Sequence, residues 1–396
     1  MKMTFLGDIM LGVDQLEGYR NKNAYDFYPA VASIAEEFKT SDIVVANLET
    51  PVAGEKLQYT FEPYSFNSPI DLPMALKRAG VTMVTTANNH CLDRGTDGLI
   101  QTIRSLNKCN LDMIGTHAKR EKSYVIKEIN GIKIGLLAYT YGTNAFHNGY
   151  YLGKDQKYMV DLLQRQELSH PFMRKIWLSK RRPIRYMRAA AKRLHIGQFD
   201  KQVYERREKG RKEIQSFRNA VTECRNEGAD YIVAFLHVGG QYNDGPTVYT
   251  RKICRLSRKF GVNAVIANHE HVVHGIDTMH MSDTSFCIYS LGNFWSSTGV
   301  TVEPYDKLVQ YSVTVTIDLD KEKSGRVKAA YTFEIFCNRL NDNRRVVSEP
   351  LIDCITSCTD GDMKEKMIQD YIFLMNRICN TKGKTYPLQR RYEVKL

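Results

Sequence analysis

The sequence predicts an α/β (layered α+β) fold, in which strands and helices form separate layers. Short runs rich in apolar and β-branched residues alternate with stretches that have helical spacing. Strands that alternate with helices are typical of layered α/β folds. Polar residues also follow the strand-like runs directly, at the positions where ligands gather in such sheets.

Seven apolar runs are predicted as strands because they have strand length and end at polar clusters. They cover Lys2–Leu6, Ile43–Ala46, Val81–Thr86, Lys133–Tyr139, Tyr231–Leu236, Val262–Ala267 and Phe286–Ser290.

Five stretches between these runs are predicted as helices. The best marked one begins with Asp71 as the expected N-cap, has Pro73 in its first turn and ends at Gly80. The others cover Tyr28–Lys39, Thr96–Lys108, Glu213–Glu227 and Thr247–Phe260.

The predicted organisation is one main domain, residues 1–320, followed by an appended element, residues 321–396. Residues 145–212 contain no strand-like run long enough for a core, so we expect a basic, partly helical insertion there. The polar motifs stop after about Asp320. The remaining chain is predicted to hold a strand over Val327–Phe336 and a helix over Asp362–Cys379.

The composition indicates a globular protein. Of 396 residues, 43% are apolar and 25% are charged, and no apolar run reaches the 18 residues typical of a membrane span. Nine cysteines, an odd number without a Cys-x-x-Cys pair, favour a reducing compartment. Because no signal peptide or transmembrane segment is recognised, we expect a cytoplasmic protein.

The positive charge is concentrated in one segment. The net charge is +12, and residues 172–213 hold 15 Lys and Arg against 4 Asp and Glu. This segment suits an anionic substrate or polymer, or peripheral contact with an anionic membrane. The alternative is a pair of amphipathic helices with a solvated charged face. No recognised nucleic-acid-binding module accompanies it, so the sequence does not favour nucleic acid.

The polar clusters contain the residue types of a metal site. In chain order they include Asp8, Asn47, Glu49, Asn89, His90, His237, His269 and His271. Mixed carboxylate, amide and imidazole ligands suit Mn²⁺, Zn²⁺ or Fe. A dinuclear centre needs a bridging carboxylate and several terminal ligands, with the ions about 3.5–4 Å apart. The set meets that demand, so we expect two divalent ions.

These clusters and their neighbours resemble the motifs of the CapA family, poly-γ-glutamate capsule synthesis proteins of the calcineurin-like metallophosphatase superfamily. The motifs are Gly7-Asp8, Asn47-Leu48-Glu49, Ala87-Asn88-Asn89-His90 with Asp93 and Gly95, His237, His269-x-His271 and Tyr289-Ser290-Leu291-Gly292-Asn293-Phe294. The resemblance covers about residues 3–300, interrupted by the insertion.

The resemblance implies a metallophosphatase-like β-sandwich flanked by helices, and it implies roles for single residues. His90 would act beside the substrate as an acid or charge stabiliser, with Asp93 as its orienting partner. The implied metal ligands are Asp8, Glu49, Asn89, His237, His269 and His271. Asn47, Gln241 and Asn293 are candidate substrate-binding residues, although Asn47 and Asn293 also suit a role in bracing their loops.

Some features depart from the family pattern. Met10 stands where metallophosphatases have the histidine of Asp-x-His, and Glu270 stands where the family has proline between two histidines. Gln241 replaces a family glutamate and cannot act as an anionic base or ligand. The N-terminal membrane anchor of many relatives is not recognised in this sequence.

Two functions follow as hypotheses. The first is a metal-dependent hydrolase that uses metal-activated water on a phosphoester or a related acyl or amide substrate, in the synthesis of poly-γ-glutamate or another capsule polymer. The alternative is a non-catalytic component of capsule assembly that binds the anionic polymer. The ligand set favours the first hypothesis, whereas Gln241 and the basic segment favour the second.

Overall fold

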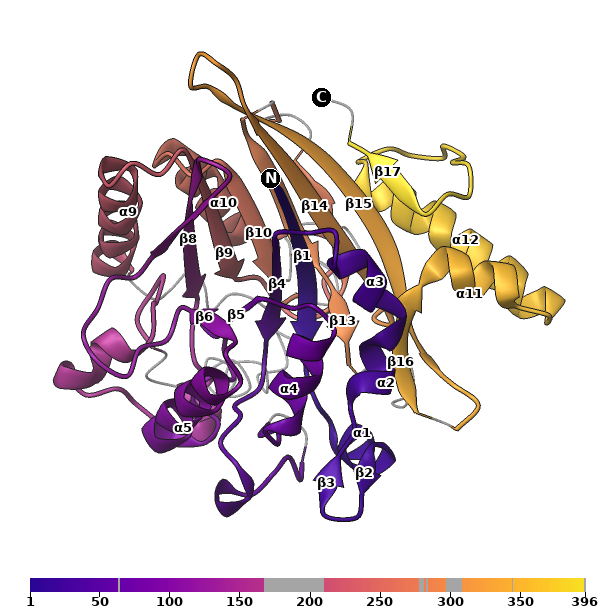
Figure 1. Cartoon of the computed structure of the whole chain (residues 1–396), viewed down its shortest axis with the longest axis horizontal. Helices are drawn as coiled ribbons and strands as arrows, with labels where there is room; N and C mark the ends of the chain where they lie inside the picture. Colours follow the sequence, from indigo (N-terminus) through magenta and orange to yellow (C-terminus); the bar gives the residue numbers. More distant parts are fainter. Residues whose placement is uncertain are drawn as a thin grey trace, which may run out of the picture.

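The computed structural model describes residues 1–62, 65–166, 210–277, 281–282, 284–296, 308–343 and 345–394. Within these residues two large β-sheets lie face to face, and helices cover their outer faces (Figure 1). The predicted layered α/β fold, a β-sandwich flanked by helices, is confirmed.

The first sheet combines parallel and antiparallel strands. Its order is β16 (Val346–Pro350), β15 (Val327–Leu340), β14 (Tyr311–Lys321), β1 (Lys2–Ile9), β4 (Ile43–Leu48), β5 (Met83–Thr85) and β6 (Asp112–Ile114). Two short strands join it, β13 (Asn293–Trp295) beside β1 and β17 (Arg391–Glu393) beside β15. Strands β1, β4, β5 and β6 run parallel, so their carboxyl ends lie at the same edge.

The second sheet has a parallel centre and antiparallel margins. Its order is β11 (Val273–Ile276), β12 (Phe286–Leu291), β10 (Ala264–Asn268), β9 (Tyr231–His237), β8 (Ile132–Thr140) and β7 (Val125–Ile129). Strands β8, β9, β10 and β12 are parallel. A separate ribbon pairs β2 (Arg20–Asn21) with β3 (Ala24–Tyr25).

Three layers of buried apolar side chains hold the sandwich together. The inner layer lies between the sheets and includes Phe5 of β1 and Phe235 of β9. A second layer packs the first sheet against α2 (Tyr28–Val31), α3 (Ala35–Phe38) and α4 (Asp71–Arg78). The third packs the second sheet against α9 (Arg211–Asn226) and α10 (Val248–Lys259). Because β9 and β10 are buried on both faces, they read in the sequence as continuous apolar runs.

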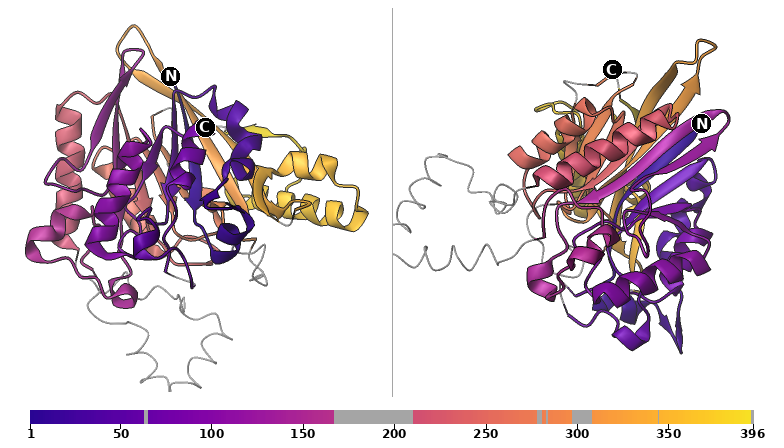
Figure 2. Two further views of the ribbon diagram at one scale, coloured as in Figure 1. Left: turned by 60° about the horizontal axis from the view of Figure 1, so that its bottom comes forward. Right: turned by 90° about the vertical axis from the view of Figure 1, so that its left-hand side faces the viewer.

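The other helices lie around this sandwich. They are α1 (Val13–Gly18), α5 (Gly95–Lys108), α6 (Ala145–Asn148), α11 (Leu351–Ser357) and α12 (Gly361–Ile378), with 3₁₀ turns at Ala32–Ile34, Glu55–Leu57 and Lys154–Met159. Figure 2 shows the C-terminal helices, in yellow, on the opposite side of the molecule from α9 and α10. No helix among the described residues combines the length and hydropathy needed to cross a membrane.

All seven predicted strands are present, but two predicted helix details are wrong. The stretch Tyr28–Lys39 is broken into α2, a 3₁₀ turn and α3. The backbone leaves the helical region at Val31 (φ −128°), and the Ser33 hydroxyl donates to the Ser348 carbonyl of β16. Asp71 is the first residue of α4 and not its N-cap, because its carboxylate accepts a hydrogen bond from Tyr25 N instead.

The residues after 320 continue the first sheet. The boundary predicted at residue 320 falls inside the β14–β15 hairpin, in which Lys321 pairs with Val327. The predicted helix over Asp362–Cys379 is present as α12, and Asp360 caps it by accepting a hydrogen bond from Met363 N at 2.9 Å.

The predicted insertion joins β8 to its parallel neighbour β9. Its described part contains α6, the 3₁₀ turn at Lys154–Met159 and the start of α9. Residues 167–209, with most of the basic segment 172–213, lie outside the described residues.

Candidate metal centre

The candidate centre lies where the carboxyl ends of parallel strands from both sheets meet. Strands β1, β4 and β5 lead to the two carboxylates and the amide, while β9 and β10 lead to the three histidines. The six predicted ligands are all buried there: Asp8, Glu49, Asn89, His237, His269 and His271. The sheet edges thus collect side chains from positions far apart in the sequence.

One half of the centre is built around Asp8. Its Oδ2 lies 3.4 Å from Nδ1 of His271 and accepts a hydrogen bond from the backbone N–H of His269, also at 3.4 Å. The Oδ1 atom accepts from Nδ2 of Asn47 at 2.7 Å. Oδ1 of Asn293 lies 3.0 Å from the same His271 nitrogen, so Asp8 and Asn293 together orient that ring.

The other half is built around His237. Its Nε2 lies 2.7 Å from Oδ1 of Asn89 and 3.2 Å from Oε1 of Glu49. The same glutamate oxygen lies 3.9 Å from Nε2 of His271. Glu49 therefore stands between the two halves.

The donor set fits a divalent cation. Two groups of side chains offer ligand atoms within 4.8 Å of one another, Glu49–His269–His271 and Asp8–Glu49–His237, and both include Glu49. Oε2 of Glu49 and Nδ1 of His269 are buried and make no hydrogen bond within the described part of the chain. Leaving such groups buried without a partner is costly, and a bound cation would remove that cost.

Burial and neighbouring charges perturb the pKa values here. Burial raises the pKa of Asp8, and the charge of Glu49 adds to this effect. Burial would also raise the pKa of Glu49, but His237 and His271 outweigh it and lower that pKa. Burial lowers the pKa of His271, yet Glu49 and Asp8 raise it to about 9. Burial and His237 lower the pKa of His269 well below its ordinary value, so its imidazole is neutral at pH 7 and offers a lone pair.

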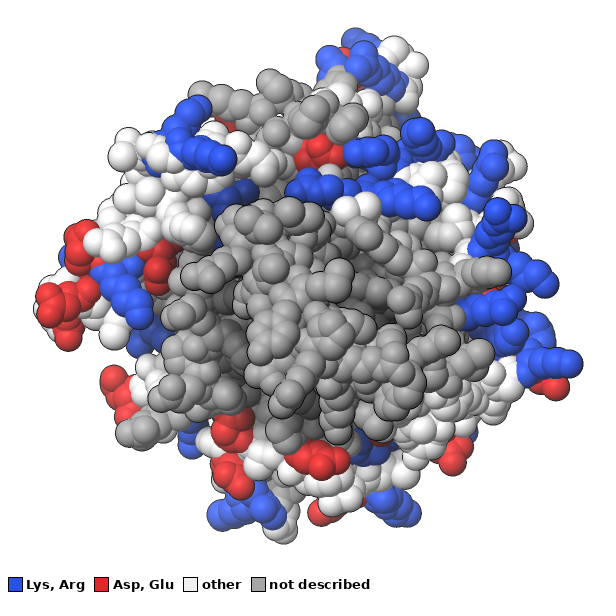
Figure 3. All heavy atoms as spheres, turned by 180° about the vertical axis from the view of Figure 1, so that it is seen from behind, with Lys and Arg blue, Asp and Glu red and all other residues white. Residues whose placement is uncertain are grey.

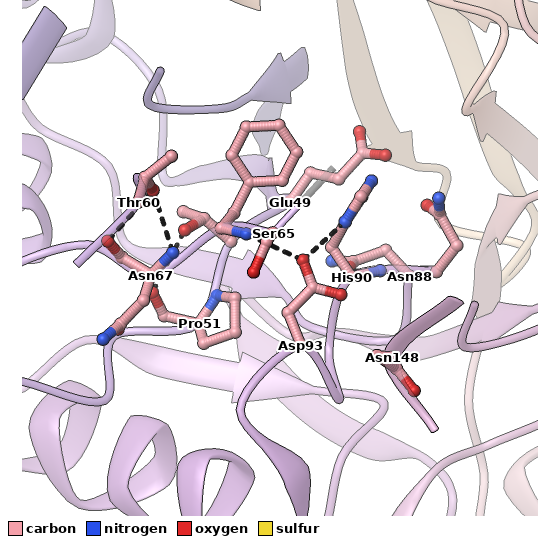
Figure 4. A network of polar contacts seen from close by, with 12 residues as sticks. Glu49, Pro51, Thr60, Ser65, Asn67, Asn88, His90, Asp93 and Asn148 are labelled. Carbon is pink, nitrogen blue, oxygen red and sulfur yellow. Dashed lines mark hydrogen bonds and ion pairs between the residues drawn. The ribbon is translucent and has the colours of Figure 1, made fainter. Parts of the chain in front are cut away.

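His90 is held by Asp93 beside this centre, as Figure 4 shows. The Nδ1–H of His90 donates to Oδ2 of Asp93 at 2.7 Å, and the same oxygen accepts from Phe66 N at 2.9 Å. The other ring nitrogen, Nε2, is buried without a hydrogen bond among the described residues and points toward the Glu49 carboxylate. Burial lowers the pKa of His90, but Asp93 and Glu49 outweigh it and raise that pKa.

Two of the three predicted substrate-binding residues, Asn47 and Asn293, contact predicted ligands at the centre. The amide of Asn47 donates to Asp8, lies 3.3 Å from Nδ1 of His237 and accepts from the Thr85 hydroxyl at 2.9 Å. Its buried amide therefore braces the two sheets. Asn293 contacts His271 and donates to the Val309 carbonyl at 3.2 Å. Gln241 is half-buried on the loop after β9.

Several neighbours of the centre were not predicted from the sequence. The ring of Tyr141 lies 4.7 Å from that of His269, and the ring of Tyr242 lies 5.7 Å from that of His271. The Asn88 side chain accepts from His90 N at 3.1 Å. Tyr141 directly follows β8, so the strand-end rule that found the histidines could also have found this tyrosine.

Charged side chains on the surface are unevenly distributed. In Figure 3, Lys and Arg side chains gather along the upper and right-hand margin of the visible face. The exposed residues of α10 include Lys252, Arg255 and Lys259, and that helix contains no acidic residue. Positive charge therefore extends beyond the basic segment that the sequence singled out.

A family model described as "Bacterial capsule synthesis protein PGA_cap" matches residues 2–298. The match contains every predicted site residue. The chain belongs to this family. The resemblance to CapA inferred from the motifs is confirmed.

Two curated relatives carry the CapA name. The "Capsule biosynthesis protein CapA" of Bacillus anthracis is 24% identical over 316 residues, 78% of this chain and 63% of that protein. The "PGA biosynthesis protein CapA" of Bacillus subtilis (strain 168) is 24% identical over 332 residues, 82% of this chain and 70% of that protein. The chain thus spans less than two thirds of the Bacillus anthracis relative.

Two solved structures from Thermus thermophilus were also matched. A hypothetical protein aligns with a TM-score of 0.41 and 12% identity over 84% of this chain and 98% of its own. The protein TT1561 aligns with a TM-score of 0.34 and 8% identity over 83% of this chain and 97% of its own.

Proposed function

We propose that this chain is a metal-dependent hydrolase that acts on a phosphoester or a related acyl or amide bond in the synthesis of an anionic capsule polymer. The observation that carries the proposal is the Glu49 carboxylate, which is fully buried between two groups of metal-ligating side chains. A carboxylate in that position needs a cation, and the paired groups suit two of them.

The residues divide into two sets of ligands around Glu49. Asp8 and His237 form one group with Glu49, His269 and His271 form the other, and Asn89 lies beside His237. Two divalent ions, Mn, Zn or Fe, would lower the pKa of a water molecule and polarise the bond under attack when bound. Asn47 and Asn293 hold Asp8, His237 and His271 in place for this purpose.

His90 has the geometry of a general acid. Its Nδ1–H is committed to Asp93, which leaves Nε2 as the nitrogen that can exchange a proton with a substrate. Since Asp93 and Glu49 raise its pKa, the ring keeps its proton to a higher pH than an ordinary histidine. It can therefore protonate a leaving oxygen or stabilise charge on it.

The polymer assignment rests on the family and on charge. Two relatives are named for capsule or PGA biosynthesis. Poly-γ-glutamate is an amide-linked polyanion, and residues 172–213 hold 15 basic against 4 acidic residues. We propose that this segment binds the anionic substrate, with anionic membrane lipid as a second anionic surface for it.

Metal analysis tests the proposal first. The purified protein, reconstituted with Mn²⁺ or Zn²⁺, should hold about two ions per chain by elemental mass spectrometry. It should also hydrolyse bis(p-nitrophenyl) phosphate or a related ester or amide probe. His269→Ala should lose both properties. His147→Ala, an exposed histidine on α6, is the matched control and should keep them. Full activity in His269→Ala would refute the proposal.

A second candidate is a non-catalytic component that binds the polymer. Gln241, which cannot ionise, is the residue that favours it. Protein that binds polyglutamate without metal, and hydrolyses no probe with metal, would support this role instead. Deletion of residues 172–209 should then abolish the binding.

A further inference from the structure

Glu270 lies between two predicted ligands, and its carboxylate lies against the loop that follows β9 and 3.9 Å from Nδ1 of His274. The residue is fully buried. A Cβ atom added to Gly239 would lie 2.1 Å from Glu270 Oε1, so the carboxylate occupies the space of a side chain at position 239. Its Oε2 accepts from Nδ2 of Asn243 at 3.4 Å. Glu270 therefore faces the loop of residues 239–243, which follows β9.

That loop is fastened to the segment that carries His269 and His271. Tyr242 N donates to the Glu270 carbonyl at 2.8 Å, so Glu270 holds the loop through its backbone as well as its side chain. Nε2 of His274 donates to the Asn243 carbonyl at 2.9 Å. Inside the loop, Nδ2 of Asn243 also donates to the Gly240 carbonyl at 3.0 Å.

The backbone on both sides of this contact is in the left-handed region. Tyr242 has φ +63°, and His269 and His271 have φ +103° and +57°. Such angles strain residues that carry side chains, and they persist only where surrounding contacts impose them. Glu270 lies between the two strained histidines and bonds directly to the strained tyrosine. Glu270 is therefore placed to impose this shape.

The loop presents Tyr242 to the candidate centre, with its ring 5.7 Å from the His271 ring. We propose that Glu270 is a positioning residue that holds the 239–243 loop, and that Tyr242 on this loop contacts the anionic group of the substrate beside His271. The statement about Tyr242, the substrate half of the inference, rests on the proposed function. The statement about Glu270 and the loop, the anchoring half, concerns the folded chain alone.

Hydrogen exchange tests the anchoring half without any activity. In metal-free protein, peptides that cover residues 238–247 should lose protection by about tenfold or more in Glu270→Ala, because a buried hydrogen-bonded anchor is removed. Glu270→Gln fills the same space and still offers an oxygen to Asn243, so it should exchange like the wild type. Asn243→Ala, a milder change, should give an intermediate loss. Unchanged exchange in both Glu270→Ala and Asn243→Ala would overturn the inference.

Steady-state kinetics test the substrate half on Mn²⁺-loaded protein with bis(p-nitrophenyl) phosphate. Tyr242→Ala should raise KM about tenfold with kcat within about threefold, as expected for lost binding in the ground state. Glu270→Ala should likewise raise KM while kcat changes little, and Glu270→Gln should have the KM of the wild type. Mn²⁺ binding by calorimetry should stay within about threefold in Tyr242→Ala and Glu270→Gln, whereas Glu270→Ala, which loosens the backbone of two ligands, should weaken it about tenfold or more.

The outcomes separate the two proposals. Wild-type kinetics in Tyr242→Ala would refute the substrate contact of Tyr242 but would not contradict the proposed hydrolase function. A wild-type protein that hydrolyses no probe would refute the proposed function and the substrate half together, whereas the anchoring half would still be decided by exchange.

Discussion

Gly7→Ala should separate two strands and displace Asp8. A Cβ atom at Gly7 would lie 2.1 Å from the Gly292 carbonyl oxygen, which is backbone and cannot rotate away. Ordinary contact begins near 3.4 Å, so β1 and β13 must move apart by about 1.3 Å, the difference between these distances. The 2.9 Å hydrogen bond from Asp8 N to the same carbonyl is then lost.

The size of the effect follows from these two terms. Overpacking costs about 1–3 kcal/mol and the lost hydrogen bond about 1 kcal/mol, so the free energy of unfolding should fall by about 2–4 kcal/mol. A displacement of about 1 Å at Asp8 should also lower turnover about 100-fold, because its distance to His271 changes.

Urea unfolding and metal analysis measure both effects. Gly18→Ala is the matched control, because a Cβ there meets only an Arg345 side-chain atom at 3.7 Å. It should not lower stability, since alanine favours a helix over glycine, and it should leave the metal content unchanged. Gly7→Ala with wild-type stability and wild-type metal content would refute the reasoning from the close approach.

Three further predictions concern the metal, a buried carboxyl and a helix cap. Removal of metal by a chelator should lower stability, by about 2.7 kcal/mol relative to protein with free ion at 100 times its Kd; calorimetry with and without Mn²⁺ measures this, and equal unfolding midpoints would contradict a bound ion. Burial and the nearby Glu37 raise the pKa of Glu334 to about 7, although Arg390 opposes them. The folded state then binds this proton more tightly than the unfolded state. The contribution of this carboxyl to the free energy of unfolding is therefore fully present below about pH 4.5 and is lost as pH rises through about 7. Glu334→Gln should therefore be more stable than the wild type at pH 8 and similar at pH 4.5, and urea unfolding that shows no such difference would oppose it. Asp360→Ala removes the cap that accepts from Met363 N at 2.9 Å and should cost about 1 kcal/mol; the loss should be absent in Asp362→Ala, which is not the cap.

The strands were predictable because their environment is simple. A run such as Tyr231–Leu236 is apolar throughout because both faces of β9 are covered, by the other sheet and by helices. The candidate ligands were predictable for a related reason. A polar residue directly after a buried strand must find a partner, and strand ends are where partners gather.

The helix over Tyr28–Lys39 was not predictable in detail. Its local spacing is helical, but the hydroxyl of Ser33 bonds to Ser348, a residue more than three hundred positions away. Such a contact overrides local propensity and has no signal in the local sequence. The same holds for Tyr242, whose place beside His271 depends on how β9 and β10 pair.

The sequence by itself determined the alternation of strands and helices and the residue types at the strand ends, because burial imposes apolar runs and chemistry limits which side chains ligate metals. The tertiary structure decided the direction in which these side chains point. Asn47 turns its amide to Asp8 and His237, and Glu270 places its carboxylate against Gly239. The tertiary structure also placed β15 and β16 in the first sheet. These outcomes depend on long-range pairing and on backbone angles, which a linear pattern does not contain.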